Sequence, residues 1–60
     1  MNTTFNNTKK VINNLYTKGK LTDTMKNALK EKIDVFYLNN RITNDEYNML
    51  MKLLEGEENA

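Results

Sequence analysis

The chain has 60 residues, with nine Lys or Arg against eight Asp or Glu, and it contains no Cys and no His. A chain of this length forms one domain at most, with a small core, and it has neither disulfides nor the usual zinc ligands to reinforce that core. The commonest general base and the thiol nucleophile are missing as well. We therefore expect no enzymatic activity: no catalytic residue, no small-molecule substrate, and no cofactor or metal site.

The pattern of apolar residues predicts an all-α fold, a small bundle of three helices over about residues 5–18, 23–38 and 44–55. We expect one helical domain across residues 1–60, with loose ends at 1–4 and 57–60. Pro is absent, and Gly occurs only at positions 19 and 56, each just beyond a periodic stretch. A left-handed residue commonly closes the last turn of a helix there, and Asn40 or Asn39 is expected to do so at the middle junction.

The first predicted helix is amphipathic, and Thr3 or Thr4 is expected to cap its N-terminus. The residues on its apolar side are Phe5, Thr8, Val11, Ile12, Leu15 and Tyr16. The first twenty residues contain four Lys and no acid, whereas acids gather toward the C-terminus. This polarity has two interpretations: either both ends of the chain are simply solvated, or it suits packing between copies of the chain or against a partner.

The second predicted helix follows Thr22 as its N-cap, with Asp23 in the first turn, where the helix dipole favours negative charge. Its main apolar face contains Met25, Ala28, Leu29, Ile33 and Phe36, with Val35 beside them. Lys32 lies within that stripe, so its stem is expected to run along the core edge. Tyr37 and Leu38 point off the stripe and need either the first helix or another chain to cover them.

The third predicted helix has the most explicit start. Thr43 and Glu46 have the spacing of a capping box, in which each side chain bonds the backbone N–H of the other residue. Ile42 and Tyr47 occupy the two positions of a hydrophobic staple. The sequence therefore predicts that the second and third helices form a helical hairpin or corner.

The third predicted helix also has two apolar seams. The main one contains Tyr47, Leu50, Met51 and Leu54. Met49 and Leu53 form the other, about 120° or more around the helix. Either the first and second helices each cover one seam, or a second chain covers one of them. The candidate partner-binding residues are Tyr37, Leu38, Met49 and Leu53.

Two other classes of partner are less well supported by the sequence. No stretch resembles a signal peptide, and no apolar run approaches the ~20 residues of a membrane span, so we expect no membrane partner and a cytoplasmic location. Two helices joined by a short turn also suit a helix-turn-helix. The third helix, however, offers only Lys52 after its cap, among several acids, which argues against nucleic-acid binding.

Two families share parts of this pattern. The motif Leu15-Tyr16, Gly19-Lys20-Leu21-Thr22, Arg41-Ile42-Thr43, Tyr47 and Gly56 resembles the XkdX family of very small bacteriophage and prophage proteins encoded in tail modules. The segment 33–54, with Arg41-Ile42-Thr43-Asn44-Asp45-Glu46-Tyr47 and Met51-Lys52-Leu53-Leu54, is similar to the short C-terminal domains called SHOCT. Either resemblance implies an interaction role.

Our leading hypothesis is therefore a non-enzymatic, phage-encoded protein that packs apolar helix faces against itself, as a homo-oligomer, or against a larger virion or tail-assembly protein. It would be located in the host cytoplasm or within the virion. The alternative is a small regulator or inhibitor of a host protein, and nucleic-acid binding comes third.

Overall fold

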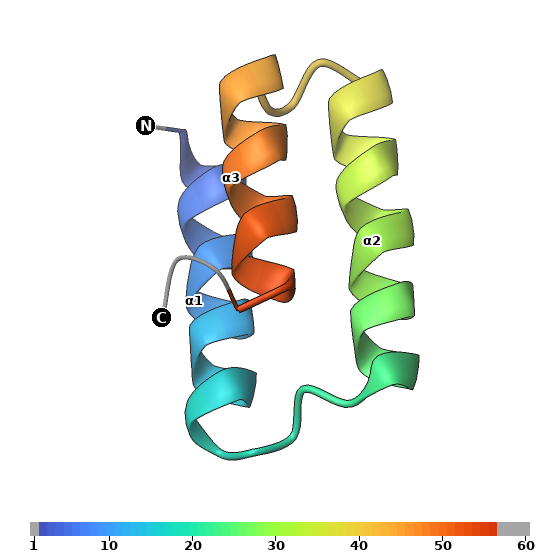
Figure 1. Cartoon of the computed structure of the whole chain (residues 1–60). Helices are drawn as coiled ribbons and strands as arrows, with labels where there is room; N and C mark the ends of the chain where they lie inside the picture. Colours follow the sequence, from blue (N-terminus) through green and yellow to red (C-terminus); the bar gives the residue numbers. More distant parts are fainter. Residues whose placement is uncertain (1, 57–60) are drawn as a thin grey trace.

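The computed structural model describes residues 2–56, which form three helices and no strand. Their bounds are Thr3–Thr17 for α1, Asp23–Leu38 for α2 and Asn44–Leu54 for α3. Successive helices run in opposite directions, so α2 and α3 form an antiparallel hairpin (Figure 1). The all-α three-helix bundle expected from the sequence is confirmed, and its last two helices form a hairpin rather than a corner. The predicted loose end at 57–60 lies outside the described residues.

The start of α1 differs from the prediction. Asn2, not Thr3 or Thr4, is the N-cap, and its Oδ1 accepts a hydrogen bond of 2.7 Å from the Phe5 N–H. Residues 2–4 are therefore the cap and first turn of the helix rather than a loose end. The Asn2 side chain is also tied down from a distance, because its Nδ2 donates to Oε1 of Glu46 at 2.8 Å. A pattern of neighbouring residues does not reveal that contact.

The other two helix starts are as predicted. Thr22 Oγ1 accepts from the Met25 N–H at 3.2 Å, which caps α2. At α3, Thr43 Oγ1 accepts from the Glu46 N–H at 3.1 Å, and Glu46 Oε1 accepts from the Thr43 N–H at 2.8 Å. Both bonds of the capping box are thus present.

The helix ends also follow the prediction. Gly19 and Gly56 have φ values of 68° and 81°, in the left-handed region that glycine adopts without a steric penalty. Asn40 does the same after α2, with φ of 59°. Asn39, the other candidate at that junction, instead has φ of −91° and forms the C-cap of α2.

All three helices contribute to one core, and α3 is its centre. The buried apolar side chains are Phe5, Ile12, Leu29, Ile33, Ile42, Leu50, Leu53 and Leu54. Burying a side chain of this size contributes roughly 1.5–3 kcal/mol. Ile42, the first residue of the predicted staple, is buried, and Tyr47, its second residue, packs against the core.

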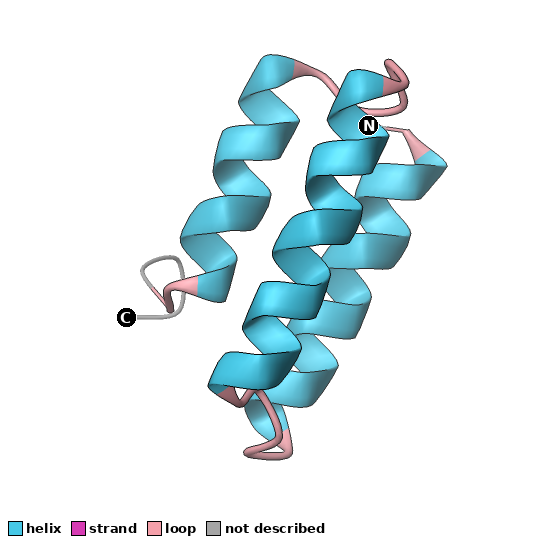
Figure 2. Ribbon diagram, turned by 90° about the vertical axis from the view of Figure 1, so that its right-hand side faces the viewer, coloured by secondary structure: helices cyan, strands magenta, loops and turns pink. Residues whose placement is uncertain are grey.

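The position of α3 leaves one side of the bundle open. α3 packs closely against both α1 and α2, whereas α1 and α2 make few contacts with each other. In the view onto α2, α3 lies to the left and α1 behind and to the right (Figure 2). With only 11 residues, α3 covers about 16 Å of the roughly 24 Å length of α2. The side of the α1–α2 pair away from α3 is therefore where an uncovered surface can lie.

Candidate protein-interaction surface

The four candidate partner-binding residues do not share one exposed surface. Leu53 is only 4% exposed and belongs to the core, and Met49 is half-buried against the same core. Tyr37 and Leu38 remain on the surface, 39% and 77% exposed. Leu53 is therefore not accessible to a partner in this fold. The second seam of α3 is covered within the chain, because α3 lies between two helices and buries more than one side.

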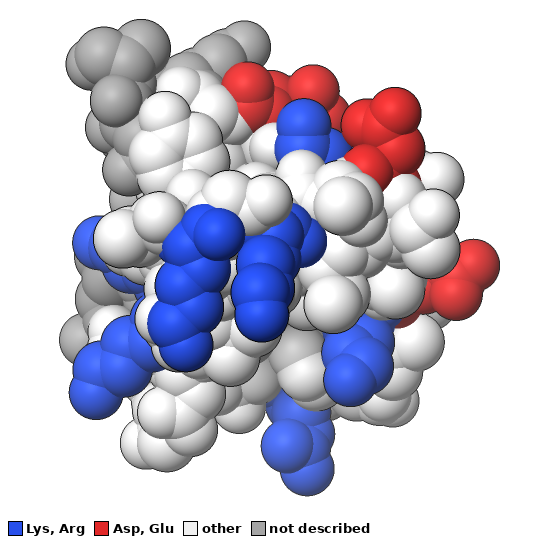
Figure 3. Space-filling model, turned by 90° about the horizontal axis from the view of Figure 1, so that it is seen from below, with Lys and Arg blue, Asp and Glu red and all other residues white. Residues whose placement is uncertain are grey.

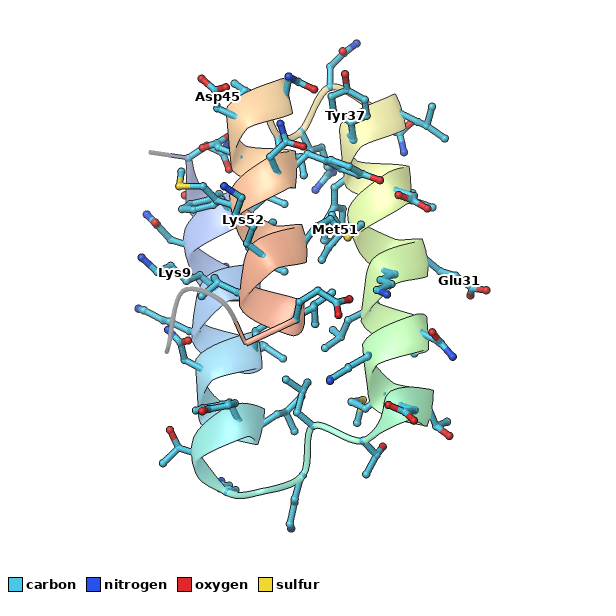
Figure 4. The ribbon with its side chains drawn as sticks, in the orientation of Figure 1. Lys9, Glu31, Tyr37, Asp45, Met51 and Lys52 are labelled. Atoms are coloured by element: carbon cyan, nitrogen blue, oxygen red, sulfur yellow. The ribbon has the colours of Figure 1, made fainter. Side chains whose placement is uncertain are left out.

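Tyr37 is exposed, but contacts within the chain hold it in place. Its ring lies 4.9 Å from that of Tyr47, centroid to centroid, at an interplanar angle of 42°. Its hydroxyl donates to Asn44 Oδ1 at 3.4 Å. Tyr37 extends from the end of α2 toward α3 in Figure 4. Tyr37 therefore links α2 to α3 within the hairpin. Of Tyr37 and Leu38, Leu38 is the more accessible to a partner.

Tyr47 continues this polar cluster. Its hydroxyl donates to Asp34 Oδ1 at 2.7 Å, which links α3 to α2 a second time. The Asp34 carboxylate accepts this bond from the protonated phenol and so raises the pKa of Tyr47, with burial acting in the same direction. The tyrosine remains neutral, and the cluster is a structural tie between two helices.

An apolar groove lies between α1 and α2, and no residue of α3 lines it. Its inner part has a volume of about 150 Å³ and is formed by Asn7, Thr8, Val11, Leu29, Lys32 and Phe36. A shallower part continues along α2, formed by Ala28, Glu31, Lys32, Val35 and Phe36. We call these two parts together the α1–α2 groove. Val11 and Val35, one from each helix, are 47% and 52% exposed.

The sequence placed these groove residues in the core or at its edge. Val11, Ala28 and Val35 lie on or beside the apolar stripes of the first two helices, yet all three are exposed. The stripe of α2 is wide, because Leu29 and Ile33 face the core while Ala28 and Val35 lie further around the helix. One short neighbouring helix does not cover so wide a stripe. That width was the signal in the sequence that part of the stripe would stay exposed.

The charged residues of the groove lining are one Lys and one Glu. Lys32 lines both of its parts, and α1 carries Lys but no acid. Seen from the end of the bundle that contains the α1–α2 connection, Lys and Arg occupy the middle and the lower side, while most of the acids lie toward the upper right (Figure 3). Glu31 is the one acid in the groove lining, and it projects outward from α2 (Figure 4).

Among the described residues, the carboxylates that form contacts within the chain are Asp34, Glu46 and Glu55. Glu46 accepts from the Thr43 N–H, which is the main reason why its pKa lies below the ordinary value of 4.5, while burial acts in the opposite direction. Glu46 therefore links the start of α3 to the start of α1, through its bonds to Thr43 and Asn2. Residues 2–56 contain no group of three or more His, Cys, Asp or Glu side chains placed to hold a metal ion.

Within the same described residues, no helix is long and apolar enough to cross a membrane.

No protein-family model matches this chain, and neither a curated protein nor a solved structure matches it.

Proposed function

We propose that this chain is a non-enzymatic structural or interaction protein, which acts by packing apolar helix surface against another protein. The α1–α2 groove carries this proposal. Val11, Val35 and Phe36 present apolar surface from two helices on the side that α3 leaves uncovered. Apolar side chains that gather on one side of a protein, rather than being scattered singly, are candidates for a contact site.

The resemblance to the XkdX family supports a more specific setting. The sequence motifs that carry it lie at helix ends and starts, namely Gly19, Thr22, Thr43, Tyr47 and Gly56. We propose on this basis that the protein is phage-encoded and that its partner belongs to the virion tail or to its assembly. A host protein as the partner would instead make the chain a small regulator or inhibitor.

Site-specific crosslinking in the native host cell tests this proposal. A photoreactive amino acid replaces Val35 in the groove, and in a matched control it replaces Lys52, which is exposed on α3. We expect position 35 to capture a defined protein and position 52 to capture none, with mass spectrometry identifying the product. A virion or tail-assembly protein supports the phage role, and a host enzyme supports the regulator. Equal capture at both positions would contradict the proposal.

Binding to duplex DNA is the control for the third hypothesis. We expect no retardation of duplex DNA in a gel, even at low salt. Strong binding that weakens steeply as salt rises would instead indicate phosphate contacts and a nucleic-acid function.

A further inference from the structure

We infer that the α1–α2 groove binds one amphipathic helix of a partner protein, with aliphatic side chains along one face and acidic side chains beside them. The inference rests on the proposed interaction function and specifies the chemistry of the partner. Three observations carry it: the shape of the groove, the charge around it, and the absence of a matching helix in a second copy.

The shape of the groove suits a helix. One wall is formed by Asn7 and Val11 of α1, and helical spacing continues this row to Lys18, two turns beyond Val11. The other wall is formed by α2 residues from Ala28 to Phe36. The two walls are antiparallel helices of 15 and 16 residues, about 22–24 Å long. A helix of about four turns packed between them would complete a four-helix bundle.

The charge of the groove selects the partner. Lys32 lies among apolar side chains of the groove. The ion pair found within residues 2–56 does not involve Lys32, because it joins Lys30 to Glu55. Lys18, the C-cap of α1, lies at the far end of the α1 row. The one acid of the groove lining, Glu31, borders only the shallower part and projects outward from α2. An apolar ridge alone would leave these ammonium groups facing a neutral helix. Carboxylates on the partner would pair with them and speed association, more strongly at low salt.

A second copy of the chain fits the groove less well. The apolar side chains of α3 that could form a ridge, such as Leu50 and Leu53, are buried in its own core. Two copies meeting groove to groove would bring the Lys32 ammonium groups of both copies into one interface. Like charges so placed oppose association. The groove therefore fits a different protein better than a copy.

A peptide titration of the full 60-residue chain tests the inference. The probe is a synthetic helix of about 18 residues with Leu along one face and Glu on both flanks, and the matched peptide has Lys in place of Glu. Backbone amide shifts in NMR spectra report where each peptide binds. We expect shifts to concentrate on Val11, Ala28, Lys32 and Val35, and the acidic peptide to bind about tenfold more tightly at low salt.

Matched variants separate charge from shape. Lys32→Glu should remove the preference for the acidic peptide, while Lys52→Glu on α3 keeps it. Val35→Ser should weaken binding of the acidic peptide, while Leu38→Ser leaves it unchanged. Equal affinity for both peptides, no binding, or shifts away from the groove would overturn the inference. So would a dimer in sedimentation equilibrium that Val35→Ser dissociates, because a second copy would then fill the groove.

The outcome also distinguishes this inference from the proposed function. If position 35 captures a native protein but the peptides do not bind as described, the interaction function stands and the acidic helix does not. If the peptides bind but nothing is captured in the cell, the groove is competent and the proposed function fails.

Discussion

The interfaces that α3 makes and the interface between α1 and α2 are built differently. Asn2 at the start of α1 bonds Glu46 of α3, and α2 reaches α3 through the Asp34–Tyr47 bond and the Lys30–Glu55 ion pair. Among residues 2–56, no side-chain hydrogen bond or ion pair joins α1 to α2. The buried core residues pack between α3 and the two longer helices, and the groove lies on the side of α1 and α2 that faces away from α3.

This difference shows how a 60-residue chain distributes a limited core. With three helices there are three possible contacts between them, and the short α3 completes two of these by lying against both longer helices. The third contact is left apolar but open. A partner helix could occupy that side without disturbing the polar links that hold α3 in place.

The largest expected effect tests which apolar residues belong to the covered side. Leu53→Ala should lower the free energy of unfolding by about 2–5 kcal/mol, because Leu53 is buried and its removal leaves a cavity. Stabilities of about 0.05–0.15 kcal/mol per residue mean that such a loss removes much of the total for this chain. Urea denaturation followed by circular dichroism measures it.

Leu38→Ala is the matched control, since it removes the same side chain from a site that is 77% exposed. Its effect should stay within about 0.5 kcal/mol. Similar losses for the two variants would show that Leu53 of α3 is not buried against the rest of the bundle in solution.

Features set by neighbouring residues were predictable from the sequence, and features set by the placement of α3 were not. The caps at Thr22 and Thr43 depend on residues only three positions apart, and the turns at Gly19 and Gly56 on a single residue each. The cap at Asn2 was missed because Thr3 and Thr4 are also acceptable caps. Asn2, the N-cap found in the structure, also bonds Glu46, which is 44 positions away in the sequence.

Burial was predicted less well for the same reason. Periodicity identifies an apolar stripe but not which part of a wide stripe a neighbour covers. Leu53 therefore appeared available to a partner, while Val11 and Val35 appeared to belong to the core. The groove could be anticipated only as surplus apolar surface, because its location depends on how three helices pack.

A smaller effect is expected where α3 begins. Thr43→Ala should cost about 1 kcal/mol by removing the N-cap of α3, the helix that both interfaces share. Thr22→Ala should cost less, because the Thr22 cap bond is longer, at 3.2 Å, and is exposed. Urea midpoints of the two variants measure this difference. An equal or larger loss for Thr22→Ala would indicate that the α3 start is not the more important junction.

Acid should weaken the link between α1 and α3. The folded-state pKa of Glu46 is lowered, so its contribution to stability is complete above the ordinary value of 4.5 and is lost as the pH falls through the lowered pKa. We expect the melting temperature to fall in that window, and the fall to be smaller in Glu46→Gln, whose amide does not titrate. An identical pH dependence in both proteins would assign the acid sensitivity to other carboxylates.

The smallest expected effect is in the groove itself. Val35→Ser should change the free energy of unfolding by no more than about 0.5 kcal/mol, because Val35 is half exposed and because Ser and Val have similar helix propensities. Urea denaturation of the isolated chain measures this, with Leu53→Ala as the reference for a covered site. A loss above about 1 kcal/mol would mean that the isolated chain already fills its groove. The contrast between the α3 interfaces and the α1–α2 side would then fail. Val35 would already be buried in the free chain and would not be accessible to a partner.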